Sequence, residues 1–197
     1  EIRTPLNAIL GFSRIIAETD NSEERLQYYD IVEKNNMRLQ ELINEILDLS
    51  KIESGMMEFN YAPVNLYKLC DDVKNTYRFR CQSGVDLIFE QSDRSLYIST
   101  DRNRLFQIFS NLIGNATKFT QKGHISFGYK KVDNQIIFHV TDTGTGIPAE
   151  KLPKIFDRFM MANDNVAGTG LGLSISKNLA ELMNGNISVT STEGKGN

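Results

Sequence analysis

The sequence predicts an α+β protein, in which a helical hairpin forming a dimeric four-helix bundle is followed by an α/β sandwich. Apolar residues recur at intervals of three and four up to Ser54 and Gly55, which indicates long helices. After Met57 the pattern changes to short alternating runs bounded by Gly, Asp, Asn or Ser, which indicates strands. We therefore expect one domain over residues 1–55 and a second over residues 56–197.

The composition excludes several classes of protein. With 197 residues, 40% of them hydrophobic, the chain can bury the cores of one or two domains, so disorder is not expected. The formal net charge of -3 and the pI near 5.5 give no basic field, so we expect no direct binding to nucleic acid. Cys70 and Cys81 form no CxxC pair and have no histidine at metal-ligand spacing. This argues against a zinc site or a disulfide framework and favours a cytoplasmic location.

The hydropathy of the chain and the residues at its two ends indicate what kind of parent protein we expect. No apolar run approaches the roughly 18 to 20 residues of a membrane span. The sequence begins at Glu1 without a methionine, so we interpret it as the cytosolic part of a longer protein that could be membrane-anchored upstream. Because it stops in the turn at 194–197, we expect a final strand to be missing.

A heptad seam predicts the second helix of the hairpin. Apolar and small residues recur there at intervals of four and three, and these are Tyr28, Val32, Asn35, Leu39, Leu42, Ile46 and Leu49. The polar run 19–22, followed by Glu23 and Glu24, supplies N-cap candidates and first-turn acids, so a turn separates this helix from a first helix over residues 1–17. Two antiparallel helices cannot cover so wide an apolar stripe. We therefore expect a second copy to complete a four-helix bundle, which makes the protein a homodimer.

Strands and helices alternate in the second domain. Alternating apolar runs predict strands at 85–89, 96–99, 125–129 and 136–140. The stretches between them predict helices at 66–81, 104–118 and 174–183. Elements of this kind and order favour helices packed on one face of a mixed sheet.

Two asparagines and a lysine close the predicted helix at 104–118. Asn111 and Asn115 are four residues apart and share a helix face, with Lys118 within one turn. An amide oxygen is a hard, neutral ligand that suits Mg²⁺ already surrounded by phosphate oxygens, and a lysine offers positive charge to phosphates. The alternative is polar decoration of a surface helix, and the spacing alone does not decide between the two.

Asp142 directly follows an apolar strand and is followed by Gly144, Gly146 and Ile147. Two glycines in three residues let a ligand approach the backbone, and the carboxylate can accept a hydrogen bond from an exocyclic amine such as that of adenine. Asp-x-Gly turns also follow strands in proteins that bind no ligand, so this pattern is weak in isolation.

A glycine-rich loop precedes the predicted helix at 174–183. Its residues are Gly168, Thr169, Gly170, Leu171 and Gly172. Their amides and the positive end of the helix could hold phosphates. The loop is no Rossmann fingerprint, since no strand runs directly into it, and no Walker loop, since no Gly-Lys-Ser/Thr follows. The polar run 163–165 before it has the features of a mobile lid over a nucleotide.

Together and in this order, the motifs resemble those of the sensor histidine kinases of two-component systems. Residues 111–120 resemble their N box, 142–147 their first glycine box, 155–159 their F box, 168–173 their second glycine box, and 194–196 the start of a third. Their ATP-binding domain is of the GHKL (Bergerat) type, shared with gyrase, heat-shock chaperones and mismatch-repair ATPases. Residues 1–6 resemble the H box, which separates the kinases from the other ATPases. The resemblance covers nearly the whole chain.

The resemblance implies a binding site for ATP and Mg²⁺. Asn115 would hold Mg²⁺ with help from Asn111, Lys118 would contact phosphate, and Asp142 would bind the adenine amine. The glycine loops and the F box would contact the triphosphate and the lid, through Gly144, Gly146, Ile147, Phe156, Gly168, Thr169, Gly170, Leu171 and Gly172.

The resemblance also implies roles for the H box. The phosphoaccepting histidine would stand immediately before Glu1, which would orient or deprotonate it, and Thr4 would position a water molecule for dephosphorylation. His124 and His139 fall in the predicted sheet and are interpreted as ordinary strand residues. The chain as it stands is therefore expected to be inactive in autophosphorylation.

Three activities fit this resemblance. The first is an ATP-dependent histidine kinase that passes its phosphoryl group to an aspartate in the receiver domain of a response regulator, separate or within the same parent chain. The second is a phosphatase of that regulator, which Thr4 permits. The third is a non-catalytic dimerisation module whose conformation nucleotide stabilises. Intact Asn115, Asp142 and Gly170 favour the kinase.

Overall fold

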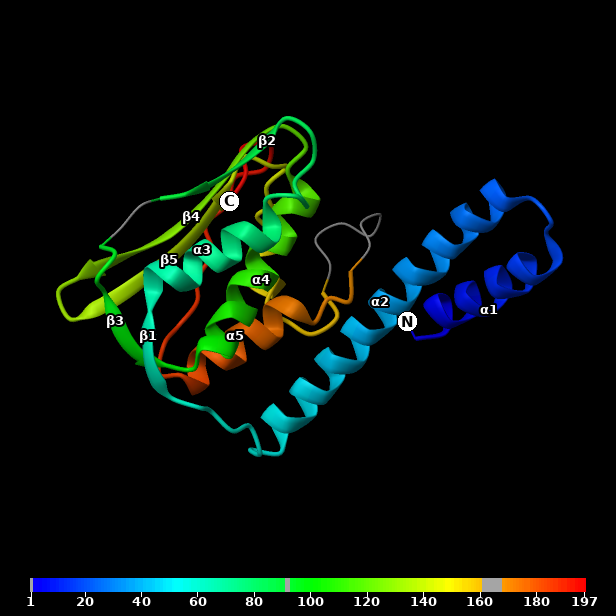
Figure 1. Ribbon diagram of the computed structural model, residues 1–197. Helices are drawn as coiled ribbons and strands as arrows, with labels where there is room; N and C mark the ends of the chain where they lie inside the picture. The colour runs from blue at the N-terminus through cyan, green and yellow to red at the C-terminus, as the bar shows by residue number, and fades with distance from the viewer. Residues whose placement is uncertain (1, 91–92, 161–167) are drawn as a thin grey trace. The chain divides into compact units, whose positions relative to one another are not determined.

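The computed structural model describes residues 2–90, 93–160 and 168–197, and the chain divides into two compact units, Glu1–Met57 and Glu58–Asn197. The first unit is a helical hairpin, and the second contains the strands (Figure 1). Glu1 and the polar run 163–165, which the sequence predicts to be a lid, lie outside the described residues.

The hairpin joins α1 (Arg3–Glu18) to α2 (Ser22–Glu53). Asn21 is the N-cap of α2, and its side chain accepts hydrogen bonds from the backbone amides of Glu23 and Glu24. This satisfies two of the donors that the first turn of a helix leaves unpaired. Helix α2 ends where Gly55 adopts a left-handed conformation with a φ of 67°. The two predicted helices and their turn are therefore confirmed.

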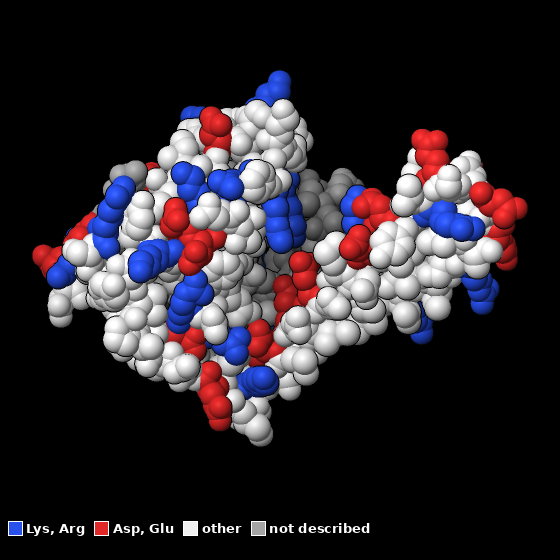
Figure 2. Space-filling view, viewed as in Figure 1, with Lys and Arg blue, Asp and Glu red and all other residues white. Residues whose placement is uncertain are grey.

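The hairpin leaves much apolar side-chain surface exposed. Leu42 is buried in α2, and the rings of Phe12 and Tyr28 stack with centroids 5.6 Å apart. Large apolar side chains still remain exposed on both helices: Leu6, Leu10, Ile15, Leu26, Tyr29, Met37, Ile43, Ile46 and Leu47. Figure 2 shows uncharged surface between the charged side chains of the hairpin. Exposed apolar surface of this extent is typical of an interaction face.

None of the helices in the described ranges is long and apolar enough to cross a membrane.

The second unit contains a mixed three-stranded sheet and a separate two-stranded ribbon. In the sheet, β4 (Gly123–Val132) is parallel to β2 (Val85–Phe89) on one side and antiparallel to β5 (Gln135–Asp142) on the other. The ribbon pairs β1 (Ala62–Asn65) with β3 (Tyr97–Thr100). The sequence pattern does not predict β1, because its four residues include Pro63, which is found only at edges and bulges of sheets.

Helices α3 (Leu66–Tyr77) and α4 (Arg102–Phe119) pack on one face of the sheet, and α5 (Gly172–Leu182) packs against α4 (Figure 1). A short 3₁₀ helix, η1 (Leu152–Lys154), precedes α5. Helix α3 ends before its predicted limit of residue 81, because the amide of Arg80 bonds to the carbonyl oxygen of Tyr77 in a turn. The layering confirms the predicted sandwich.

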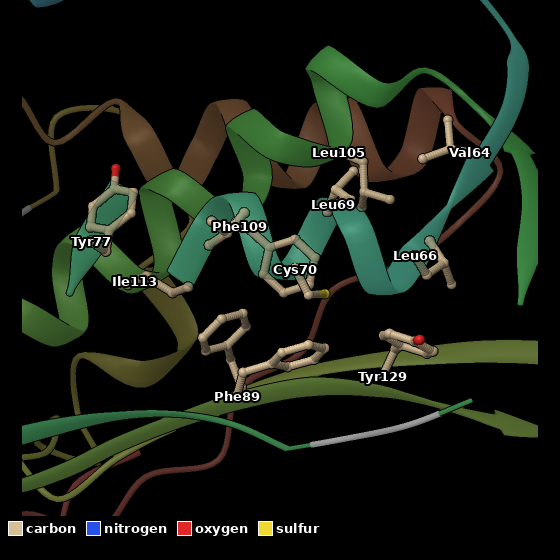
Figure 3. Close-up of a cluster of buried hydrophobic side chains, with 12 residues drawn as sticks. Val64, Leu66, Leu69, Cys70, Tyr77, Phe89, Leu105, Phe109, Ile113 and Tyr129 are labelled. Carbon is tan, nitrogen blue, oxygen red and sulfur yellow. The ribbon is translucent and has the colours of Figure 1, made fainter. Parts of the chain in front are cut away.

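The core lies between the helices and the sheet (Figure 3). Phe127 of β4 occupies its centre, with its ring centroid 5.9 Å from that of Phe109 on α4 and 5.5 Å from that of Phe89 on β2. The buried side chains around them come from α3, α4 and the sheet: Leu66, Leu69, Cys70, Val73, Tyr77, Leu105, Ile113 and Tyr129. Because Phe109 and Ile113 face this core, Asn111 and Asn115 lie on the other side of α4.

Asp101 fixes the start of α4. Its Oδ1 accepts hydrogen bonds from the amides of Asn103 at 2.9 Å and Arg104 at 3.0 Å, and its Oδ2 accepts one from the amide of Asn60 at 2.8 Å. Burial alone would raise the pKa of Asp101, but the backbone amides of Arg104, Asn60 and Asn103 and the charge of Arg104 outweigh burial and hold the pKa below its usual range. The ionised carboxylate therefore ties the loop before β1 to α4.

Replacing Asp101 with alanine is expected to lower the free energy of unfolding by about 2 kcal/mol, since an N-cap and a loop tether are both lost. Because the pKa of Asp101 is lowered in the folded protein, this stabilisation is present at neutral pH and is lost as the pH falls through that pKa. Urea unfolding of variant and wild type over a pH series measures the difference, which should shrink in acid. Asp86→Ala, at an exposed strand position, is the control and should change stability by less than about 0.5 kcal/mol. A difference that persists unchanged in acid would contradict the role of the ionised carboxylate.

Candidate nucleotide-binding site

Asp142 is the last residue of β5 and is only 8% exposed. Its pairing with the buried Ile125 of β4 places it on the helix-covered face of the sheet. Its Oδ1 accepts a hydrogen bond from the amide of Gly144 at 2.8 Å, and its Oδ2 accepts one from Nδ2 of Asn197 at 2.9 Å. The carboxylate is therefore held in one orientation and still has lone pairs for a further donor.

The turn after Asp142 requires glycine at two positions. A Cβ on Gly144 would lie 2.5 Å from the carbonyl oxygen of Phe119. Gly146 has a φ of 64°, and a Cβ there would lie 2.3 Å from the carbonyl oxygen of Thr192. The backbone of this turn therefore approaches both the end of α4 and the loop at 191–197, more closely than any side chain allows.

Hydrogen bonds join this turn to two segments that are distant in the sequence. The amide of Thr145 donates to the carbonyl oxygen of Phe119 at 3.2 Å, and the amide of Gly194 donates to the carbonyl oxygen of Thr145 at 2.8 Å. The amide of Ile147 donates to Oγ of Ser191 at 2.8 Å. The segments 111–120, 142–147 and 194–196, which the sequence analysis singled out separately, therefore meet at one place.

The two asparagines of α4 have different surroundings. Asn111 Nδ2 donates to the carbonyl oxygen of Gly172 at 3.0 Å and to Oγ of Ser176 at 3.1 Å, so it joins α4 to the start of α5. Asn115, one turn further along, is half-buried, and its carboxamide makes no hydrogen bond within the described part of the chain. Lys118 lies exposed in the last turn of α4. A carboxamide oxygen and an ammonium group are thus available on the side of α4 that faces away from the core.

The second glycine loop leads into the N-terminus of α5. Gly170 has a φ of 70°, and a Cβ there would lie 2.6 Å from the carbonyl carbon of Phe159, whose amide donates to the carbonyl oxygen of Gly170 at 2.9 Å. Leu171 is fully buried, and its amide donates to Oγ1 of Thr169 at 3.2 Å. A Cβ on Gly168, by contrast, would meet open space. The loop is therefore anchored at Gly170 and Leu171, directly before the helix begins.

The other residues that the sequence analysis identified are Thr4, Phe156, His124 and His139. Thr4 is exposed in the first turn of α1. Phe156 is half-buried, and Nζ of Lys177 on α5 lies 5.9 Å from the centroid of its ring. His124 and His139 lie in β4 and β5, as predicted.

Several residues of the site are not identified by sequence patterns. Ser176 accepts from Asn111, Ser191 accepts from Ile147, and Asn197 donates to Asp142. Asn197 directly follows the segment 194–196, so the start of a third glycine box is the one sequence signal that points to it.

This arrangement suits a nucleotide. A nearly buried carboxylate can bind an exocyclic amine, glycines admit close backbone approach, and the N-terminus of α5 offers amides to phosphates. No group of three or more His, Cys, Asp or Glu that could hold a metal is found among the described residues. The carboxamide oxygen of Asn115 could serve as a protein ligand for a cation whose other ligands come from phosphates.

Both units match known families. Residues 1–55 match HisKA, the His Kinase A (phospho-acceptor) domain. Residues 100–197 match HATPase_c, the histidine kinase-, DNA gyrase B-, and HSP90-like ATPase. The autoinducer 2 sensor kinase/phosphatase LuxQ of Vibrio vulnificus (strain YJ016) is 39% identical over 208 residues, which cover 100% of this chain and 24% of LuxQ. The chain thus spans about a quarter of the length of this relative.

Two solved structures extend the comparison. Full-length ShkA in complex with AMPPNP is 31% identical, with a TM-score of 0.79 over 98% of this chain and 42% of the ShkA chain. The histidine kinase ThkA in complex with the response regulator protein TrrA is 26% identical, with a TM-score of 0.73 over 99% of this chain and 56% of that chain. Both similarities extend over the hairpin and the sandwich.

Proposed function

Since this chain belongs to the sensor histidine kinases, as a HisKA hairpin followed by a HATPase_c domain, we propose that it is the ATP-dependent kinase core of a two-component signalling protein. The γ-phosphoryl group of ATP passes to a histidine immediately before Glu1 in the parent chain, and then to an aspartate of a response regulator. The chain as given contains only His124 and His139, which lie in the sheet, and is therefore expected not to autophosphorylate.

The meeting of three sequence-distant segments around Asp142 carries this proposal. The carbonyl oxygen of Phe119 and the amide of Gly194 both bond to Thr145, so the end of α4 and the C-terminal loop surround the turn that follows the carboxylate. A nearly buried carboxylate beside a turn that only glycine can form supports nucleotide binding, and the labelling experiment below distinguishes a kinase from a dimerisation module that nucleotide only stabilises. The same arrangement brings together groups that suit an adenine amine and phosphates, which supports the proposal.

Each residue of the site has its own role in binding ATP. ATP with Mg²⁺ supplies the transferable phosphoryl group and the cation that neutralises its charge. Asp142 accepts a hydrogen bond from the adenine amine, and Asn115 offers its carboxamide oxygen to Mg²⁺. Lys118 and the amides at 168–172 stabilise the phosphates. Phosphoryl transfer needs little more from a protein than this positioning and charge stabilisation.

The hairpin supplies the acceptor and the interaction surfaces. By the same resemblance, Glu1 would orient or deprotonate the preceding imidazole, because attack on the γ-phosphorus requires the free lone pair of a ring nitrogen. The exposed apolar residues of α1 and α2 become buried when a second copy completes a four-helix bundle. ThkA is found in complex with the regulator TrrA, and we extend a response-regulator partner to this chain on that basis. The core works in the cytoplasm, where ATP is available.

The test uses the chain extended upstream through the acceptor histidine. Incubation with Mg²⁺ and γ-labelled ATP should give an acid-labile, base-stable phosphoryl group on the wild type and none on Asn115→Ala. Binding of ATP without label would contradict the kinase. In that case release of phosphate from a labelled regulator, lost in Thr4→Ala, would identify a phosphatase, an activity that the sensor kinase/phosphatase LuxQ also carries in its name. Absence of ATP binding would contradict the nucleotide site itself.

A further inference from the structure

Asn197 makes three hydrogen bonds to a single residue, Asp142. Its amide donates to the carbonyl oxygen of Asp142 at 3.2 Å, and its carbonyl oxygen accepts from the amide of Asp142 at 3.0 Å. Its side chain adds the third bond, from Nδ2 to Oδ2 at 2.9 Å. The two backbone bonds place the residues directly opposite each other, in the manner of neighbouring antiparallel strands.

Gly196 makes this approach possible. It has a φ of 91°, and a Cβ there would lie 1.9 Å from the carbonyl oxygen of Asp142. The chain is therefore pressed against the end of β5 at the residue just before Asn197, which leaves Asn197 little freedom to move away.

The orientation of the Asn197 carboxamide follows from its partner. A carboxylate accepts hydrogen bonds and repels another acceptor, so the NH₂ group must face Asp142 and Oδ1 must point elsewhere. That oxygen is buried and accepts no hydrogen bond from the described residues. The carboxamide therefore presents its donor, and not its acceptor, to the carboxylate.

We infer that Asn197 is a positioning residue for Asp142 and that it sets the preference of the site for a 6-aminopurine. This inference rests on the proposed ATP site. Gly144 holds Oδ1 of the carboxylate and Asn197 holds Oδ2, so the lone pairs that remain point in a fixed direction. A carboxylate fixed in this way accepts a hydrogen bond from an amino group at position 6 of the purine and repels the carbonyl oxygen that guanine carries at that position.

The experiment compares two nucleotides on the same variants. ATP carries the 6-amino group, whereas the triphosphate of purine riboside lacks it and is otherwise the same. Asn197→Ala is expected to weaken ATP binding about 10-fold, the effect of losing one hydrogen bond to a charged group, and to change binding of the purine riboside triphosphate less than about twofold. Asn186→Ala, at an exposed loop position, is the matched control and should change neither affinity.

A double-mutant cycle separates positioning from general damage. In an Asp142→Asn background, Asn197→Ala should cause no further loss of ATP affinity, because the carboxylate that it positions is gone. Equal weakening of both nucleotides by Asn197→Ala would overturn the inference, since it would indicate a merely structural role. Unchanged ATP affinity would overturn it as well while leaving the proposed function standing. A wild type that binds no ATP would overturn the proposed function and this inference together.

Discussion

Replacing Gly144 with alanine is expected to prevent ATP binding and to lower the free energy of unfolding by about 3 kcal/mol. The added methyl group would lie 2.5 Å from the carbonyl oxygen of Phe119 and 2.7 Å from Oδ1 of Asp142. Neither oxygen can move aside at low cost. The first accepts from the amide of Thr145, and the second accepts from the amide of Gly144 itself. Relief of the clash therefore breaks the junction between the end of α4 and the turn after Asp142, which we propose binds adenine.

Gly114→Ala is the control for this substitution. Gly114 lies within α4, and a Cβ there would come no closer than 3.9 Å to the ring of Tyr77, an ordinary contact. Alanine is the better helix former, so this variant should be more stable than the wild type by up to about 1 kcal/mol. Denaturant unfolding of both variants, with ATP affinity measured for Gly144→Ala, tests the pair. A Gly144→Ala protein with wild-type stability and ATP affinity would show that the junction tolerates the methyl group and is not required.

Local signals predict most of the fold. In the structure, α2 begins after Asn21 and ends before Gly55. These are the residue types that mark the N-terminus and the C-terminus of a helix in a sequence. The alternating runs of β2, β4 and β5 predict the sheet because one of its faces is buried. Strand β1 is not predicted from the sequence, because it is short and contains Pro63, so no alternating apolar pattern is visible. The end of α3 at Tyr77 is not predicted, because the helical spacing of apolar residues continues past Tyr77 in the sequence. In the structure the chain turns there to reach β2.

The site is less predictable than the fold, because its parts are joined by pairing between distant segments. Spacing shows that Asn111 and Asn115 share a face of α4, but it does not show that one of them reaches α5. The bond from Asn197 to Asp142 joins residues 55 positions apart, and no local pattern encodes which residue lies opposite the end of β5. Sequence motifs therefore identify the segments of the site, and only the tertiary structure shows which of their side chains bond to distant parts of the chain.

Asn115→Ala is expected to impair autophosphorylation without loss of stability, whereas Asn111→Ala is expected to lower stability. Asn115 makes no hydrogen bond within the described residues, so its loss should change the free energy of unfolding by less than about 0.5 kcal/mol. In the chain extended through the acceptor histidine, autophosphorylation should fall at least about 100-fold, and more Mg²⁺ should be needed for ATP binding, because a protein ligand of the cation is lost. Asn111→Ala removes the donor to Gly172 and Ser176 and should lower the free energy of unfolding by about 1–2 kcal/mol.

The dependence of ATP binding on Mg²⁺ separates the two roles. If Asn111 acts by fixing the start of α5, Asn111→Ala weakens ATP binding at every Mg²⁺ concentration and leaves the half-saturating Mg²⁺ concentration unchanged. If it also binds the cation, that concentration rises, as for Asn115→Ala. Titration of Mg²⁺ at fixed ATP, with Asn186→Ala as control, measures both. The hydrogen bonds of Asn111 favour the first outcome, because its Nδ2 already joins α4 to the carbonyl oxygen of Gly172 and to Oγ of Ser176.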